Sequence, residues 1–170
     1  MTDLNVYVPK DSALPPLLDA LRGLIAQARQ QVLRHVDQVQ VQTCWQIGRH
    51  IVEFEQGGQV RAAYGKRLLP QLGQSLAQEF GKGFDERNLR HMRAFFQSFP
   101  IWNAVRSELS WTHYRVLARV ENEEARLWYM QEAATQNWSS RALERQIGTL
   151  YYERLLLSQD KAAVEVEARE

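Results

Sequence analysis

The stretch EFGKGFDERNLRHMRAFFQSFP, residues 79–100, decides the fold of this chain. Gly81 and Gly83 predict the end of a preceding helix, because glycine adopts the conformations found at helix C-termini at little cost. Asp85 is a favourable N-cap, so a second helix is predicted over residues 86–99. A helix, a glycine turn and a capped helix together predict a helix-turn-helix.

The Gly-Lys-Gly turn contains a lysine, as phosphate-binding loops do. A Walker-type loop requires the pattern G-x-x-x-x-G-K-[ST] after a strand. Here Lys82 is followed by Gly83, and the preceding element reads as a helix. The pattern therefore excludes a phosphate loop and favours the turn between two helices.

A helical wheel of residues 86–99 separates an apolar side from a basic side. Within one arc of about 120° lie Leu89, Met92, Phe95, Phe96 and Phe99, which are predicted to face the core. Asn88 shares this arc, so its side chain is predicted to bond nearby backbone groups. The other side carries Arg87, Arg90, His91, Ala94, Gln97 and Ser98, and Arg93 flanks the apolar arc. A small alanine lets such a helix approach a DNA groove closely, so that the arginines can reach phosphates and base edges. The alternative is an ordinary amphipathic helix whose polar side faces solvent.

The remaining segments also carry apolar residues at helical spacing, which predicts an all-α fold. A long N-terminal helix is predicted from residue 17 to the EQGG sequence at 55–58; it either breaks near residues 37–42 or pairs with another helix. In the stretch 61–80, Pro70 predicts either a kink or two abutting helices, with Pro70 in the first turn of the later one. Further helices are predicted after a cap at Ser110 or Thr112, over 123–136, and over 140–157 after a cap at Asn137 or Ser139.

The last predicted helix repeats the amphipathic pattern. Its predicted buried stripe comprises Leu143, Ile147, Leu150, Tyr151 and Leu155. Arg141, Arg145 and Tyr152 are predicted to face away from that stripe. The arginines extend the candidate nucleic-acid contacts to this helix.

Charge is distributed unevenly along the chain. Residues 61–106 hold eight Lys/Arg and three Asp/Glu, a net charge of +5, whereas the remainder holds 13 and 17, a net charge of −4. Such segregation predicts a positive face on a protein of overall charge +1. Of the 21 basic residues 17 are arginine, whose planar fork suits phosphate and guanine.

The sequence shows no pattern for a catalytic, metal or cofactor site. The four histidines form no HxxxH or HExxH pair, and Cys44 lies in an apolar stripe with no evident base. No lysine has an acidic residue two positions before it, as PD-(D/E)XK nucleases require. The five tryptophans are predicted to pack in the core or at helix junctions. With no signal sequence and no membrane-spanning run, the sequence predicts a cytoplasmic protein without membrane contact.

Several long motifs resemble the N-terminal domain of the YhcG-type family of bacterial PD-(D/E)XK nucleases. They are CWQIGRHIVEFEQGG (44–58), AAYGKRLL (62–69), LAQEFGKGFDERNLRHMRAFFQSFP (76–100), LSWTHYRVL (109–117), NWSSRALERQI (137–147) and YYERLLLSQDK (151–161). Pro70 and Gly73 depart from the more regular helix of the family, and Asp85 stands where serine is usual. The resemblance implies a helix-turn-helix-like, DNA-binding part that is followed in the family by a nuclease domain.

These observations give one main hypothesis and one alternative. The predicted organisation is a flexible N-terminus (1–14), a helical domain (15–158) and a polar tail (159–170) leading to a nuclease domain absent from this chain. The main hypothesis is a DNA-binding module, and its predicted contacts are Lys66, Arg67, Lys82, Arg87, Arg90, His91, Arg93, Gln97, Arg141 and Arg145. The alternative is a protein-interaction module that forms a homodimer through the long N-terminal helix.

Overall fold

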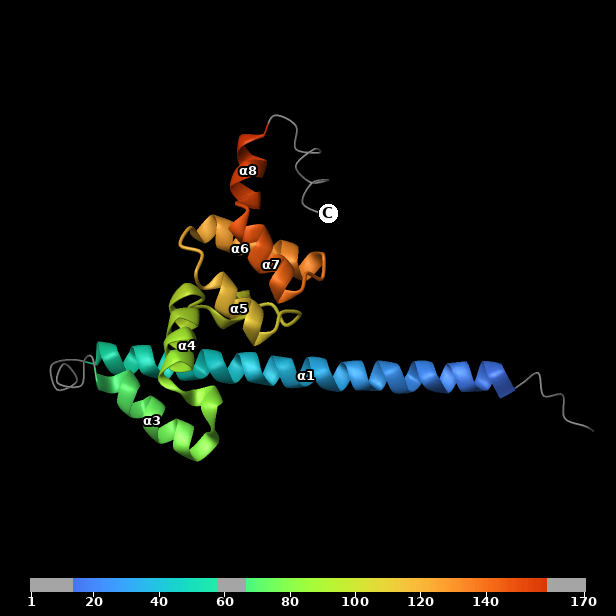
Figure 1. Cartoon of the computed structure of the whole chain (residues 1–170), viewed down its shortest axis with the longest axis horizontal. Coiled ribbons are helices and arrows are strands. Elements are labelled where there is room, and N and C mark those ends of the chain that lie inside the picture. The colour runs from blue at the N-terminus through green and yellow to red at the C-terminus, as the bar shows by residue number, and fades with distance from the viewer. Residues whose placement is uncertain (1–13, 58–66, 159–170) are drawn as a thin grey trace, which may run out of the picture. The chain divides into compact units, whose positions relative to one another are not determined.

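The computed structural model describes residues 14–57 and 67–158, and within these ranges it is helical with no strand (Figure 1). The predicted all-α fold with a long N-terminal helix is confirmed. The elements are α1 (Leu14–Gln56), α3 (Leu68–Phe80), η3 (Lys82–Phe84), α4 (Glu86–Ser98), η4 (Trp102–Ala104), α5 (Trp111–Leu117), α6 (Glu123–Thr135), α7 (Ser140–Gly148) and α8 (Tyr151–Leu157). Residues 1–13 and 159–170 of the predicted terminal segments lie outside the described ranges.

The chain divides into two compact units, residues 1–36 and residues 37–170. Helix α1 contributes to both, and its 43 residues run without interruption. The alternative of a break near residues 37–42 does not occur. That stretch contains no glycine or proline, and valine costs only a few tenths of a kcal/mol relative to good helix formers. An ion pair between Arg49 and Glu53, at 2.6 Å, adds support one turn later.

Helices α3 and α4 follow each other through the glycine turn predicted from the opening stretch. Pro70 lies in the first turn of α3, as predicted. Gly81 ends α3 with φ of 93°, a conformation that favours glycine. The Asp85 Oδ1 atom accepts a hydrogen bond from the Asn88 backbone N–H at 2.8 Å and begins α4. The two caps therefore decide where α3 stops and α4 starts.

Two glycines allow helices to approach closely in this part of the fold. A Cβ atom on Gly48 of α1 would lie 2.0 Å from the Met92 carbonyl oxygen of α4. A Cβ atom on Gly73 of α3 would lie 2.5 Å from the Glu86 backbone nitrogen at the start of α4. Both neighbours are backbone atoms, which cannot rotate away as a side chain can. Figure 1 shows α4 crossing α1, and Gly48 marks the contact.

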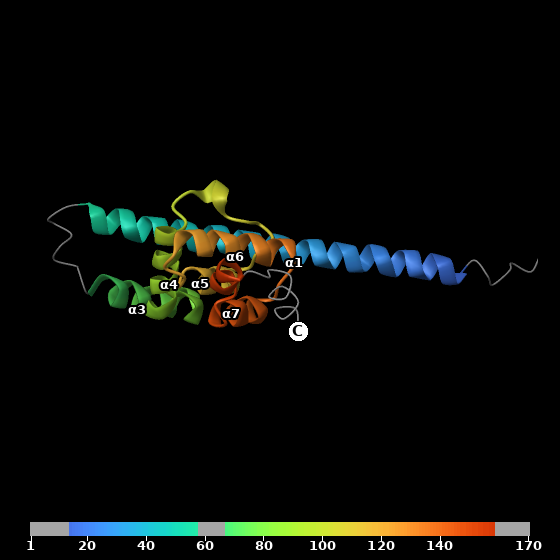
Figure 2. The same cartoon turned by 90° about the horizontal axis from the view of Figure 1, so that it is seen from above.

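The core lies where residues 37–56 of α1 meet the later helices. From this part of α1, Val41, Cys44, Trp45 and Ile51 join the cluster. The α4 side chains that were predicted to face inward pack there too, with Leu89, Met92, Phe95 and Phe99 no more than 2% exposed. Trp45 Nε1 donates to the Phe99 carbonyl at 2.7 Å. Figure 2 shows α3, α4, α5 and α7 on one side of this part of α1.

Helix α5 is held by polar contacts at its N-cap and first turn. Ser110 is its N-cap, and the Ser110 backbone N–H donates to His113 Nδ1 at 3.2 Å. With Nδ1 as acceptor, His113 Nε2 carries the proton and donates to the Trp138 carbonyl at 2.9 Å. The Tyr114 hydroxyl donates to the Arg106 carbonyl at 2.9 Å. These bonds fix α5 against the loops before α5 and α7.

The single C-terminal helix predicted over residues 140–157 is wrong, because the chain turns at Leu150. Leu150 adopts φ 53° and ψ 45°, the left-handed region, and separates α7 from α8. The turn changes the direction of the helix axis, so a single helical wheel over residues 140–157 does not give the correct side for residues at and after Leu150. Leu150 is accordingly 56% exposed rather than buried. Tyr152, predicted to face away, is half-buried, and its backbone N–H donates to the Tyr129 hydroxyl at 3.0 Å.

Candidate nucleic-acid interface

Helix α4 presents its basic side to solvent because its phenylalanines occupy the core. Arg87, Arg90 and Gln97 are exposed, whereas His91 and Arg93 are half-buried. Helix α4 begins after the tight turn at residues 81–85, and the Asn88 side chain holds that turn in place. Asn88 Nδ2 donates to the Lys82 carbonyl at 3.2 Å, so the predicted backbone role of Asn88 is confirmed.

The α4 arginines differ in their partners. Arg87 makes no ion pair with the described residues, so its guanidinium is available to an anion. Arg90 pairs with Glu86 one turn earlier, at 2.5 Å. The Arg93 Nε atom lies 3.0 Å from Glu55 Oε2 on α1. Arg93 therefore ties α4 to α1, and among the three Arg87 is the least engaged.

His91 has three arginines nearby, of which the sequence analysis predicted only Arg87. Its pKa is lowered from its ordinary value by burial, and then by the nearby guanidinium groups of Arg115, Arg119 and Arg87. Its Nε2 atom is buried and has no hydrogen-bond partner among the described residues. Arg115 and Arg119 belong to α5 and the turn after it, so α5 extends the basic side of α4.

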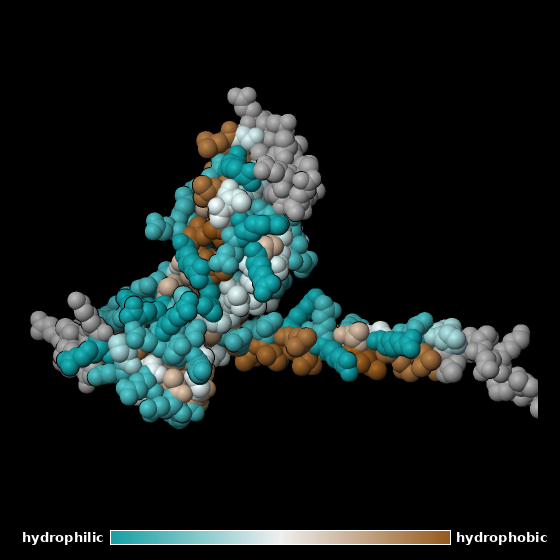
Figure 3. Space-filling view, in the orientation of Figure 1, coloured by the Kyte–Doolittle hydropathy of each residue, from teal (hydrophilic) through white to brown (hydrophobic). Residues whose placement is uncertain are grey.

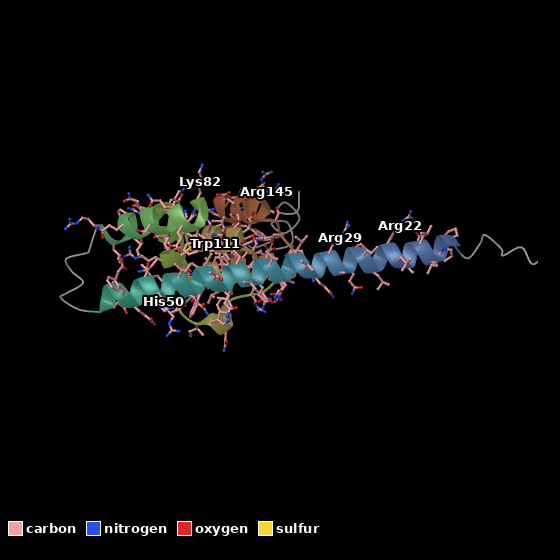
Figure 4. All side chains as sticks on the ribbon, turned by 90° about the horizontal axis from the view of Figure 1, so that it is seen from below. Arg22, Arg29, His50, Lys82, Trp111 and Arg145 are labelled. Atoms are coloured by element: carbon pink, nitrogen blue, oxygen red, sulfur yellow. The ribbon has the colours of Figure 1, made fainter. Side chains whose placement is uncertain are left out.

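Helix α7 continues the same surface. Arg119 Nη1 lies 3.3 Å from Glu144 Oε1, which joins the end of α5 to α7. On α7, Arg141 and Arg145 are exposed and form no ion pair with any residue of the described ranges. Figure 4 shows Arg145 and Lys82 projecting in the same direction. We give the name basic face to the set Lys82, Arg87, His91, Arg115, Arg119, Arg141 and Arg145.

Five of the ten predicted contacts are not among these residues: Lys66, Arg67, Arg90, Arg93 and Gln97. Arg90 and Arg93 pair with Glu86 and Glu55, and Gln97 is exposed on α4. Lys66 lies outside the described residues. Arg67 is exposed directly before α3, and no described contact connects it to the basic face. The signal that would have found the two missed arginines is their spacing. Arg115 and Arg119 are four residues apart, as residues on one side of a helix are, and apolar residues occupy positions between them.

The described residues show no arrangement typical of hydrolytic chemistry. Among them, no group of three or more His, Cys, Asp or Glu side chains could hold a metal ion. Cys44 is buried, and burial raises the pKa of its thiol to about 12, so it stays protonated at neutral pH. All five tryptophans belong to the core cluster or pack against it, as predicted. In the described parts of the chain, no helix has the length and apolar character to span a membrane.

Comparison with known proteins agrees with the helical architecture and the motifs. A family model described as the DUF1016 N-terminal domain matches residues 20–154. The chain belongs to this family. A curated relative from Escherichia coli (strain K12), named "Putative nuclease YhcG", is 36% identical over 178 aligned residues, covering 86% of this chain and 48% of the relative. The chain thus spans about half the length of that relative. No solved structure matches it.

In this DUF1016 N-terminal domain, His91 provides a pH-dependent probe of the basic face. Because the pKa of folded His91 is lowered, the unfolded chain binds more protons below the ordinary value of about 6.5. The contribution of His91 to stability is therefore intact above that pH and is lost as the pH falls. We expect a His91→Asn variant to lose less melting temperature than the wild type between pH 7.5 and 5.5.

The His91 titration is measured directly by histidine NMR. A bound phosphate beside His91 would offset the neighbouring guanidinium charges. We therefore expect saturating duplex DNA to raise the pKa of His91. A free-protein His91 pKa at or above the ordinary value would contradict the described environment, because burial and three arginines lower this pKa and only the smaller effect of Asp85 raises it.

Proposed function

We propose that this domain binds duplex DNA through the basic face. The observation that carries the proposal is the convergence of cations from α4, α5 and α7 on one surface. Arg87, Arg141 and Arg145 are exposed there and unpaired with any carboxylate of the described residues. Arginine forms bidentate contacts with phosphate, and most protein–DNA contacts are made to the backbone.

Helices α3 and α4 have the arrangement needed to place α4 in a DNA groove, as the second helix of a helix-turn-helix does. Helix α4 has 13 residues and therefore a length of about 20 Å, and a major groove of about 12 Å width admits one α-helix. Ala94 lies on the side of α4 that carries Arg87 and Gln97, and a small residue there permits close approach. In this arrangement the arginines contact phosphates, while His91 and Gln97 contact base edges.

The relative supports a role in DNA processing. Its printed name describes a nuclease, and this chain matches about half of its length. We infer that the domain holds DNA for a metal-dependent nuclease centre of the PD-(D/E)XK kind in the parent protein. The described residues contain no group of side chains that could hold a metal ion. In this proposal the domain binds the DNA, and another part of the parent protein cleaves it.

The test is the salt dependence of DNA binding by the domain alone. Labelled duplex of about 30 base pairs is titrated and followed by fluorescence anisotropy between 50 and 200 mM NaCl. Because each neutralised phosphate contributes about −0.9 to the slope of log K against log salt, about four contacts predict a slope near −3.6. A slope near zero, or tighter binding to duplex RNA than to DNA, would contradict the proposal.

A homodimer formed through the N-terminal helix is a separate function, and one observation favours it. Large apolar side chains of α1 in residues 17–36 remain exposed in the single chain. This surface belongs to the first compact unit, whereas the basic face belongs to the second. The two functions can therefore be tested independently of each other.

A further inference from the structure

The N-terminal part of α1 carries an apolar stripe that the single chain leaves uncovered. Within residues 17–36, the large apolar side chains are between 41% and 66% exposed. At 100° per residue, one arc of about 120° holds Leu17, Leu18, Leu21, Leu24, Ile25, Ala28, Val32 and Val36. We call this set the α1 stripe, and His35 is the one polar residue in its arc. Figure 3 shows hydrophobic residues gathered along this part of the helix.

The α1 stripe has the repeat of a coiled coil. Leu18, Ile25 and Val32 follow one another at seven-residue intervals and occupy position a of a heptad. Leu21, Ala28 and His35 then occupy position d. Ile25 and Val32 are β-branched at a and Leu21 is a leucine at d, and in parallel coiled coils this combination favours two strands. The pattern therefore identifies the partner as a helix of the same kind.

Charges on the two flanks of the stripe distinguish the orientations. Arg22 and Arg29 occupy position e on one flank, and Gln31 occupies position g on the other, after Leu17 and Leu24. In an antiparallel pair of identical helices the e flanks meet, which places arginine against arginine. In a parallel pair each e flank meets a g flank, so arginine meets leucine or glutamine. Like-charge contacts are thus avoided only in the parallel arrangement.

We propose that residues 17–36 of α1 form a parallel, two-stranded coiled coil with a second copy of this chain. The stripe is self-complementary in this orientation, because each a and d layer pairs a residue with its own counterpart. Pairing removes the aliphatic side chains of the stripe from water, which stabilises the dimer. The proposal concerns the first unit alone and does not depend on DNA binding.

The first experiment measures the mass of the whole chain by sedimentation equilibrium over a range of concentrations. The wild type is expected to be a dimer. An Ile25→Asp/Val32→Asp variant is expected to raise the dimer dissociation constant roughly 100-fold or more, because four carboxylates would enter the apolar seam. The matched control is Gln27→Asp/Gln30→Asp, which adds the same charge to the exposed polar side of the same helix.

The melting temperature of each variant separates association from folding. These positions are exposed in the single chain, so the core transition of the monomeric variant should remain cooperative. A wild type that remains monomeric throughout the concentration range would overturn the proposal. A dimer that the Ile25→Asp/Val32→Asp change leaves intact would overturn it as well, since the interface would then lie elsewhere.

The second experiment tests orientation with a Leu18→Cys variant under mild oxidation. In the parallel pair the two introduced thiols face each other, so a disulfide-linked dimer should form rapidly. In an antiparallel pair centred on residues 17–36, Leu18 would face residue 35, and the two copies of residue 18 would lie about 25 Å apart at 1.5 Å per residue. The native Cys44 is buried and does not compete. A non-covalent dimer without this crosslink would overturn the parallel arrangement.

Discussion

Replacing Arg87, Arg141 and Arg145 together by alanine is expected to lower duplex affinity about 100-fold at 150 mM salt. Each lost phosphate contact removes about 0.9 from the magnitude of the salt slope, so three contacts remove about 2.7. Extrapolated from 1 M salt to 150 mM, this change corresponds to about two orders of magnitude in the binding constant. The measurement is the same anisotropy titration at four salt concentrations.

The folded state should not change in this triple variant. All three arginines are exposed and none forms an ion pair with the described residues, so the melting temperature is expected to stay within about 1 °C of the wild type, as for most surface substitutions. The matched control is Arg29→Ala/Arg34→Ala/Arg49→Ala, which removes the same charge from exposed positions of α1. Equal losses of affinity in both variants would show that net charge, rather than the basic face, governs binding.

Gly48→Ala is expected to destabilise the folded domain, although alanine is the better helix former. The added Cβ would lie 2.0 Å from the Met92 carbonyl oxygen and 2.7 Å from its carbonyl carbon, so α1 and α4 must separate. Overpacking of this kind costs about 1–3 kcal/mol or more, which exceeds the gain of about 1 kcal/mol from the higher helix propensity of alanine. A contact this short with backbone atoms places the cost in the upper part of that range, so we expect a net loss of about 1–2 kcal/mol in urea unfolding.

Gly23→Ala supplies the control on the same helix. A Cβ at Gly23 meets no atom within 4 Å, so only the propensity term applies there. We expect Gly23→Ala to leave the unfolding free energy unchanged or to raise it by up to about 1 kcal/mol. Equal stability of the two variants would contradict the close crossing of α1 and α4, because the same substitution is made within one helix and only the surroundings differ.

Much of the local structure could be predicted from the sequence. The Asp85 cap, the positive φ at Gly81 and the place of Pro70 in the first turn of α3 all agree with expectation. The wheel of α4 correctly separated the buried phenylalanines from the exposed arginines. These features depend on residues within about four positions of one another, where capping and periodicity act.

The candidate site was predicted only in part. Arg87, Arg141 and Arg145 are exposed, and the structure connects their helices through α5. Arg115 and Arg119 were missed because they matter only once α5 lies against α4. Arg93 was predicted to contact DNA, and its guanidinium pairs with Glu55, 38 positions earlier in the chain. No local pattern indicates which carboxylate an arginine meets at such a separation.

By itself, the sequence determined the helical class, most helix ends, the inward side of α4 and the family motifs. Each of these depends on residues that are close to one another in the chain. Only the tertiary structure decided that Gly48 lies under Met92, that Leu150 turns the chain between α7 and α8, and that cations from three helices share one surface. The reason is that backbone caps act over one or two turns, whereas close packing joins segments tens of residues apart and selects a geometry that satisfies all of them together.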